Sequence, residues 1–275
     1  MKNNLFINVL TSAASIYLII VFIPLLWMLL TSLKDAKEIL IYPPSLIPEK
    51  ITIANYINLF RDTSFLTYLR NSFLVAACVV ILTSTIATLG AYSLCRFDYF
   101  GKQSIVISSL LGYMIAPIMI VIPFYMMMRW FGIGDTRVAL ILAHTAFCFP
   151  FALWLMKSYI KDIPVELERA AKVDGANQLQ TLVYVVLPMA VPGLTAVSIF
   201  SFILSWNDYV FARILITSDK LKTIPVGIED IYNSTVVDWG MLMAAGVVVT
   251  IPLLTGFVLV NKVFMHGWGY TGLKS

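Results

Sequence analysis

Long apolar runs separated by polar stretches dominate the hydrophobic pattern of this chain. The runs are near the length that an α-helix needs to cross about 30 Å of hydrocarbon, roughly 20 residues. A β-barrel would instead show short segments of alternating polarity. The pattern therefore predicts an all-α, polytopic membrane helical bundle with about six transmembrane helices in a single transmembrane domain. The predicted spans lie near residues 9–33, 71–95, 104–128, 138–158, 191–212 and 241–263.

Composition supports a membrane protein. Hydrophobic residues make up 60% of the 275 residues and charged residues 12%, whereas about 25% of a typical soluble domain is charged. The net charge of +4 comes without a basic cluster, so membrane lipid accounts for it and no nucleic-acid partner is expected. Cys78, Cys95 and Cys148 show no paired spacing, which favours packing roles over disulfides or a metal site. The first apolar run lacks a cleavage pattern and is expected to be a retained span.

The polar segment 157–188 lies between two apolar runs and is expected to lie in water. Asp162 is a candidate helix cap and Pro164 fits a first turn, so we predict a short amphipathic helix after them. We expect this helix to have one apolar face, formed by Ile163, Leu167, Ala170 and Ala171. We expect its charged residues to lie elsewhere on the helix, and these are Glu166, Glu168, Arg169 and Lys172.

A glycine turn and a second helix are predicted to follow. Gly175 stands where a helix C-terminus needs a positive φ. Asn177 and Gln180 have the spacing of a capping box for a second helix, which we expect to end at Pro188. Two rigid helices between membrane spans would form a lever, and the alternative is a long loop with two surface helices.

This arrangement resembles the EAA motif, the cytoplasmic coupling segment of permease subunits in binding-protein-dependent ABC importers. The family pattern is E-A-A, three residues, G, nine residues and I-x-L-P. The chain departs from it at Arg169, where glutamate is usual, and at Val185, where isoleucine is usual. The resemblance implies coupling to an ATPase subunit through Glu166, Glu168, Arg169, Ala170, Ala171, Asp174, Gly175, Leu187 and Pro188.

Three further stretches resemble one branch of these permeases, which serves carbohydrates of the maltose and maltodextrin type. They are the segment from Ser32 through Pro43 and Pro44 to Tyr56, the segment from Trp206 to Gly227, and the tail from Val263 to Lys274. The resemblance implies import of a sugar or oligosaccharide by alternating access.

No motif for nucleotide binding or hydrolysis occurs in the sequence, neither G-x-x-x-x-G-K-[ST] nor H-E-x-x-H nor G-x-S-x-G. We therefore expect no enzymatic activity and no cofactor bound by this chain, with ATP and Mg bound by a partner ATPase. Ionisable residues inside the predicted spans are sparse, which disfavours a proton- or sodium-coupled carrier.

Candidate substrate-pathway residues are few. Trp206, Asn207 and Asp208 combine an aromatic face with polar groups, as a sugar site requires, although interfacial tryptophan is also an ordinary membrane anchor. We interpret the lone His144 as a partner for a neighbouring polar group within the bundle. Several bulky residues of the third span either line a pore or pack in the bundle interior. They are Tyr113, Phe124, Tyr125, Met126, Met127 and Met128.

The expected partners are a second permease subunit, two ATPase subunits, an extracytoplasmic sugar-binding protein and membrane lipid. The expected location is a bacterial-type plasma (inner) membrane. Lysine and arginine counts do not decide orientation; a cytoplasmic segment 157–188 places both termini in the cytoplasm and makes 34–70 an ordered outer cap. The alternatives are an ABC importer permease for another solute, such as polyamine or phosphate, and a structural membrane subunit of an enzyme complex.

Overall fold

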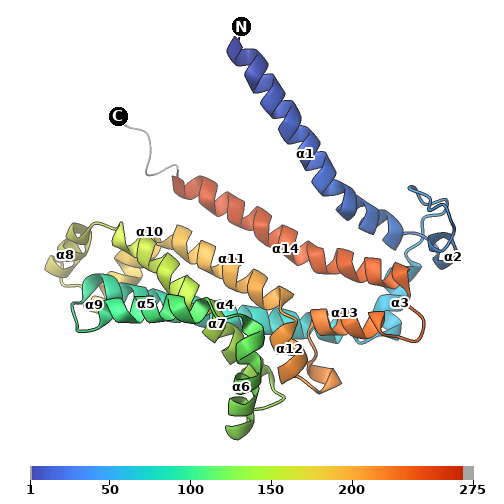
Figure 1. Ribbon diagram of the computed structural model, residues 1–275. Helices are drawn as coiled ribbons and strands as arrows, with labels where there is room; N and C mark the ends of the chain where they lie inside the picture. Colours follow the sequence, from blue (N-terminus) through green and yellow to red (C-terminus); the bar gives the residue numbers. More distant parts are fainter. Residues whose placement is uncertain (1, 269–275) are drawn as a thin grey trace. The chain divides into compact units, whose positions relative to one another are not determined.

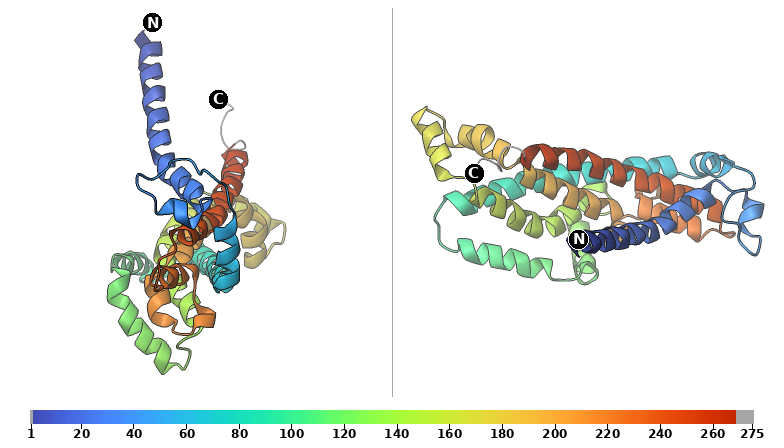
Figure 2. Two further views of the ribbon diagram at one scale, coloured as in Figure 1. Left: turned by 90° about the vertical axis from the view of Figure 1, so that its right-hand side faces the viewer. Right: turned by 90° about the horizontal axis from the view of Figure 1, so that it is seen from above.

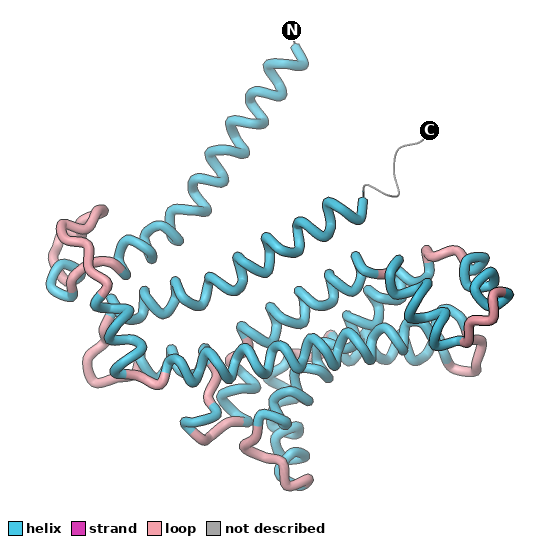
Figure 3. The backbone as a smooth tube through the Cα atoms, turned by 180° about the vertical axis from the view of Figure 1, so that it is seen from behind, coloured by secondary structure: helices cyan, strands magenta, loops and turns pink. Residues whose placement is uncertain are grey.

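A computed structural model describes the backbone of residues 2–268 and, within it, the side chains of residue 11 and residues 14–258. The described part contains helices and loops and no strand (Figure 3), as expected for an all-α fold. Its helices are labelled in Figure 1 and have the following bounds: α1 (Lys2–Ser32), α2 (Ala36–Ile39), α3 (Ala54–Asp62), α4 (Phe65–Arg96), α5 (Lys102–Tyr113), α6 (Pro117–Trp130), α7 (Arg137–Lys161), α8 (Val165–Val173), α9 (Gln178–Thr181), α10 (Leu187–Met189), α11 (Val191–Asn207), α12 (Val210–Leu215), α13 (Ile224–Tyr232) and α14 (Trp239–Trp268). A π-helical stretch, Leu182–Val186, joins α9 to α10, and a 3₁₀ turn, Asp219–Leu221, precedes α13.

Several of these helices are long and apolar enough to cross a membrane. In the described residues they are four: Ala14–Ser32, Phe65–Arg96, Arg137–Lys161 and Trp239–Val258. Two bent helix pairs raise the number to as many as six if each pair forms one span. The predicted number of about six thus requires two bent spans.

The predicted span 104–128 is wrong as a single straight helix. Helices α5 and α6 meet at a break with a bend of 103°. Ala116 has an extended backbone (φ −62°, ψ 137°), and Pro117 begins α6. Proline disfavours the helical conformation of the residue before it, which explains why the helix stops here.

The predicted span 191–212 is also interrupted. Helix α11 ends at Asn207, and Asp208 has an extended backbone (φ −69°, ψ 124°). The Asp208 carboxylate accepts hydrogen bonds from the backbone N–H groups of Phe211 (3.4 Å) and Ala212 (3.0 Å). An aspartate that caps a new helix offers the backbone an alternative to continuing the old one, and α12 starts as a separate helix.

One of two compact units comprises the chain up to Leu66 together with Gly227–Pro252. Its loop after α1 is ordered by buried polar contacts. The side-chain amide of Asn55 donates to the carbonyls of Ser32 (2.9 Å) and Lys34 (2.8 Å). The Glu38 carboxylate accepts from the Ser45 hydroxyl (2.7 Å). The predicted order of the segment 34–70 is therefore confirmed up to the end of this unit.

The other unit comprises Thr67–Val226 and the chain from Leu253 onward. Within this unit, helix α7 packs against both α5 and α11 (Figures 1 and 2). Helix α11 lies close to α7 at Gly193, where an added Cβ would come within 2.7 Å of the Tyr159 ring. Two apolar clusters are buried, one including Met156, Ile160, Leu182 and Val186 and the other including Val75, Leu140, Phe211 and Leu215.

Candidate functional site

The turn after α8 has the geometry that the sequence predicts. Gly175 has a φ of +92°. Its N–H donates to the Lys172 carbonyl (3.1 Å), and the N–H of Ala176 donates to the Ala171 carbonyl (2.9 Å). These two bonds form a Schellman motif, which satisfies carbonyls at the end of the helix. The prediction of a positive φ at Gly175 is confirmed.

The capping box of the second helix is also present. The Asn177 side chain accepts from the N–H of Gln180 (2.9 Å), and the Gln180 side chain accepts from the N–H of Asn177 (2.8 Å). The helical path then continues through the π-helical stretch and α10 to Met189, so it does not end at Pro188 as predicted. The bend to α11 follows at Ala190 and measures 79°. Leu187 is half-buried and Pro188 is exposed.

The start of α8 differs from the prediction. Asp162 is the C-terminal flanking residue of α7, with a helical backbone, and caps nothing in α8. Pro164 occupies the N-cap position, one residue before the helix, with φ −59° and ψ 129°. Helix α7 continues to Lys161 and leaves Asp162 with a helical backbone, whereas a residue that caps the start of a helix has a non-helical one.

The predicted apolar face of α8 is wrong at Ile163, which lies before the helix and is buried. Ala170 is exposed, and Ala171 is half-buried. Leu167 is 42% exposed and Val173 is 87% exposed. The outward face of α8 therefore carries apolar and small side chains together with charge. The other exposed members of the predicted coupling set are Glu166, Arg169, Asp174 and Gly175.

Glu168 is buried, although the resemblance implies that it takes part in coupling to an ATPase subunit. It is 3% exposed and is the one buried residue of α8. Its carboxylate pairs with the guanidinium of Arg96 at 2.5 Å and accepts from the Tyr92 hydroxyl at 3.1 Å. Sequence reasoning missed Arg96, because its partner lies 72 residues away in the chain.

The nearby loop between α4 and α5 carries an ion pair of a different kind. Lys102 donates to the Asp98 carboxylate at 2.7 Å, and the side chains are 37% and 100% exposed. This hydrogen bond from Lys102 holds the pKa of Asp98 below its ordinary value. Exposed pairs of this kind contribute little to stability.

The three candidate pathway residues have separate roles in the structure. Trp206 is 1% exposed, and its ring stacks on that of Phe202 with centroids 5.3 Å apart. Asn207 is exposed and donates to the Ile203 carbonyl of its own helix (2.9 Å). Asp208 caps α12, as described above. The substrate-pathway assignment of these three residues remains a prediction.

His144 has polar neighbours, as interpreted from the sequence. Its ring nitrogens lie 2.8 Å from the Ser205 hydroxyl and 3.0 Å from the Asp208 carboxylate. The residue is 1% exposed. These contacts join α7 to the point where α11 ends.

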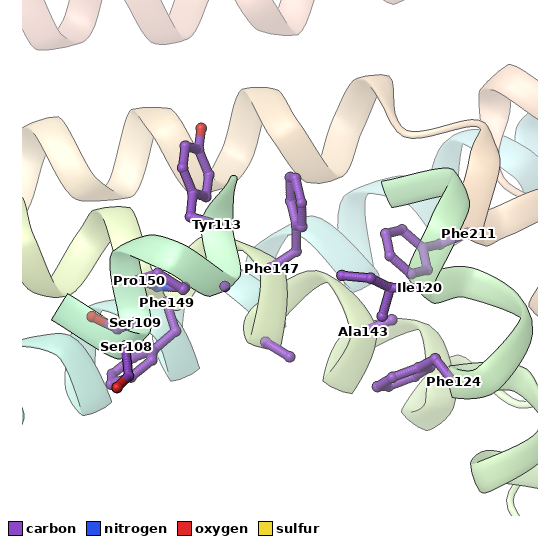
Figure 4. Close-up of a pocket in the computed structure, with 12 residues that line it drawn as sticks. Ser108, Ser109, Tyr113, Ile120, Phe124, Ala143, Phe147, Phe149, Pro150 and Phe211 are labelled. Atoms are coloured by element: carbon purple, nitrogen blue, oxygen red, sulfur yellow. The ribbon is translucent and has the colours of Figure 1, made fainter. Parts of the chain in front are cut away.

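An apolar pocket of about 400 Å³ lies beside the bend between α5 and α6 (Figure 4). Two of the bulky residues singled out in the sequence, Tyr113 and Phe124, line it, together with Phe147 of α7 and Phe211 of α12. Met128 from the same group is instead buried, and Met126 is 65% exposed. Within the described residues, no cluster of His, Cys, Asp and Glu has the geometry for a metal ion.

Comparison with known proteins gives a consistent result. The family model described as "Binding-protein-dependent transport system inner membrane component" matches residues 87–266. The inner membrane ABC transporter permease protein YcjP of Escherichia coli is 34% identical, covering 94% of this chain and 94% of that protein. The trehalose/maltose transport system permease protein MalG of Thermococcus litoralis is 32% identical, covering 93% of this chain and 92% of the relative.

Two further comparisons extend this result. The diacetylchitobiose uptake system permease protein NgcG of Streptomyces coelicolor is 34% identical, with 89% of this chain and 81% of the relative covered. A chain of a bacterial ABC transporter involved in the import of the acidic polysaccharide alginate has a TM-score of 0.84 at 23% identity, with 96% of this chain and 98% of that chain covered. At this identity, the structural likeness shows the fold alone.

Proposed function

Because the chain belongs to the family of binding-protein-dependent transport system inner membrane components, we propose that it is the permease subunit through which an ABC importer moves a sugar or oligosaccharide into the cell. The observation that carries this proposal is the segment from α8 to α10. In this segment α8 presents exposed small and apolar side chains, and the glycine turn at Gly175 follows it. The capped helix α9 comes next and leads through α10 into α11.

Docking of α8 on an ATP-hydrolysing subunit is the role we assign to this face. Ala170 allows close approach of another protein surface, and Leu167 and Val173 offer apolar area to bury. The sequence contains no phosphate-binding loop of its own. Two ATPase subunits with bound ATP and Mg would therefore supply the energy, and movement of α8 would reach the membrane helices through its connections.

A second permease subunit and an extracytoplasmic binding protein complete the proposed importer. The family description itself names dependence on a binding protein. A solved alginate ABC transporter, whose matching chain has a TM-score of 0.70, is in complex with a periplasmic protein bound to an alginate pentasaccharide. We propose the same type of assembly here, in the plasma membrane, with both termini in the cytoplasm.

A carbohydrate is the substrate class that the relatives favour. The printed functions of two of them are trehalose/maltose transport and diacetylchitobiose uptake. These names favour sugar over polyamine or phosphate. They also favour a transport subunit over a structural subunit of an enzyme complex.

Co-purification followed by an ATPase assay tests the proposal. The tagged chain is extracted from native membranes in mild detergent, and its partners are identified by mass spectrometry. We expect a second permease and an ATPase, and we expect ATP hydrolysis to rise when a binding protein loaded with oligosaccharide is added. A stable complex without an ATPase, or hydrolysis stimulated only by a binding protein loaded with polyamine or phosphate, would contradict the proposal.

A further inference from the structure

Helix α8 is attached to the rest of its compact unit in an unusual way. Most short helices are held by an apolar face that is buried against a core. The large apolar residues of α8 are instead exposed, Val165 by 37%, Leu167 by 42% and Val173 by 87%. The one buried residue of the helix is the carboxylate-bearing Glu168. Polar contacts therefore hold α8 in place.

The main contact is an ion pair with Arg96, the last residue of α4. The Arg96 Nε donates to the Glu168 Oε1 at 2.5 Å, and the two side chains are 9% and 4% exposed. Desolvated charges need well-placed partners, and removing one of a buried pair leaves the other uncompensated. A pair with this burial differs from the exposed pair between Lys102 and Asp98, which solvent screens.

The same guanidinium also binds the link between α7 and α8. The Arg96 Nη2 donates to the carbonyls of Ile160 (3.1 Å) and Ile163 (2.9 Å). Guanidinium is planar, with its N–H groups in a fixed fork. One rigid group thus joins the end of α4, the end of α7 and the middle of α8.

A second contact, from Tyr92, restricts the rotation of the Glu168 side chain. Tyr92 lies one helical turn before Arg96 on α4 and donates to the other carboxylate oxygen of Glu168 at 3.1 Å. Gln178 of α9 donates to the Tyr92 hydroxyl at 2.8 Å. A single contact would act as a pivot, whereas contacts to both oxygens fix the direction of the Glu168 side chain. The rotation of α8 about its own axis is fixed with it.

We propose that Arg96, Tyr92 and Glu168 form the mechanical joint of α8, so that a displacement of α8 is transmitted to the membrane helix α4. The three are positioning residues and leave the exposed face of α8 free. The proposal rests on the proposed function, because docking of a partner on α8 is what would apply the displacement. It goes beyond that function by naming the route from α8 into the membrane.

Two measurements on the same variants test the joint. The first is the distance distribution between spin labels at Thr85→Cys in α4 and Lys172→Cys in α8, two exposed positions, in a background whose native cysteines are replaced. The second is the ratio of sugar uptake to ATP hydrolysis in vesicles that contain the co-purified complex. The variants are Arg96→Gln, Glu168→Gln and the double variant, and the matched control is Lys102→Gln, which breaks an exposed ion pair nearby.

We expect each single variant to accumulate poorly, because each leaves one buried charge without its partner. The double variant removes both charges, so its amount should recover toward wild type. Its label distances should nevertheless broaden, and its uptake per ATP hydrolysed should fall several-fold. The control should match wild type in both measurements.

The double variant distinguishes a joint that transmits movement from an ion pair that only stabilises the fold. If the double variant recovers in amount and also keeps the wild-type distances and uptake ratio, the joint is disproved. Broadened distances with an unchanged uptake ratio would disprove the transmission that we propose. If the wild-type complex neither hydrolyses ATP nor takes up sugar, the proposed function fails, while the label distances still decide whether these residues fix α8.

Discussion

Glu166 and Glu168 are two residues apart on α8 and have opposite surroundings. Glu166 is exposed, whereas Glu168 is buried against Arg96. Helical geometry alone places them on different sides of the helix, because each residue advances by about 100°. A carboxylate that serves docking on α8 must therefore be Glu166, and the charge of Glu168 is already neutralised within the chain.

Arg169→Glu should be tolerated. Arg169 is exposed at the position where the family pattern has glutamate, so the variant restores the usual charge without disturbing the buried pair. We expect ATPase co-purification within about twofold of wild type, since exposed charge changes usually alter stability by less than about 0.5 kcal/mol. Glu166→Ala should weaken co-purification more. If Arg169→Glu abolished ATPase binding while Glu166→Ala had no effect, docking would depend on the positive charge instead.

Asp135 should contribute to stability in a pH-dependent way. Its carboxylate accepts from the backbone N–H groups of Thr217 (2.8 Å) and Ser218 (3.1 Å). Burial acts to raise the pKa of Asp135, but these hydrogen bonds outweigh it and hold the pKa below the ordinary value. A lowered folded-state pKa means that the stabilisation is present above the unfolded pKa, about 4, and is lost as the pH falls through the folded value.

The measurement is thermal unfolding of wild type and Asp135→Asn in detergent at pH 7 and at pH 3. Asparagine tolerates the positive φ of residue 135, +54°, so the backbone should remain in place. We expect the variant to be less stable by about 1 kcal/mol at pH 7, because a hydrogen-bonded carboxylate is lost. The difference should shrink at pH 3. An equal difference at both pH values would show that the charge of Asp135 is irrelevant.

At the level of the helices, local patterns predicted the turn from α8 to α9 well. A glycine followed by Asn177 and Gln180 specifies its own geometry through bonds within a few residues. The breaks at Ala116 and Asp208 also have local signals, a following proline and a capping aspartate. Hydropathy averaged over about 20 residues concealed them.

Long-range partners could not be predicted in the same way. The direction of Glu168 depends on Arg96 at the end of another helix, and no periodicity within residues 157–188 contains that information. The helical pattern alone is compatible with either face being buried. The neighbours of His144, Ser205 and Asp208, follow only from the packing of α7 against α11.

Gly175→Val should uncouple the protein without preventing its insertion. Beyond Gly175 and its two chain neighbours, no heavy atom lies within 4 Å of a Cβ added there, so the cost comes from the backbone conformation. A β-branched residue resists a φ of +92° by about 1–3 kcal/mol. This strain energy is small compared with the interactions that hold a membrane helix bundle together. It acts at the turn between α8 and α9, however, and should change the orientation of α8.

The measurement is sugar uptake and ATP hydrolysis in vesicles matched for the amount of complex. Gly175→Asn is the matched variant, because asparagine accepts a positive φ more readily than valine. We expect uptake to fall several-fold in Gly175→Val and much less in Gly175→Asn. Full uptake in the valine variant would show that the turn does not constrain α8.

For the whole molecule, orientation in the membrane follows from the proposed cytoplasmic location of α8 and α9. A cysteine at Asn177 should react with an impermeant thiol reagent only from the cytoplasmic side, after the native cysteines are replaced. A cysteine at Asn233 should react only from outside. Both residues are exposed, so each side chain is open to the reagent. Reversed labelling would overturn the orientation and the docking role of α8.

Uptake by the reconstituted complex tests the central claim most directly. The chain and its co-purified subunits are placed in vesicles that enclose ATP and Mg, and a binding protein loaded with a labelled oligosaccharide is added outside. We predict accumulation of the sugar that requires both internal ATP and the binding protein, and that is lost when this chain is omitted. Uptake that continues without ATP, or that is unchanged when this chain is left out, would contradict its assignment as the permease subunit of a sugar importer.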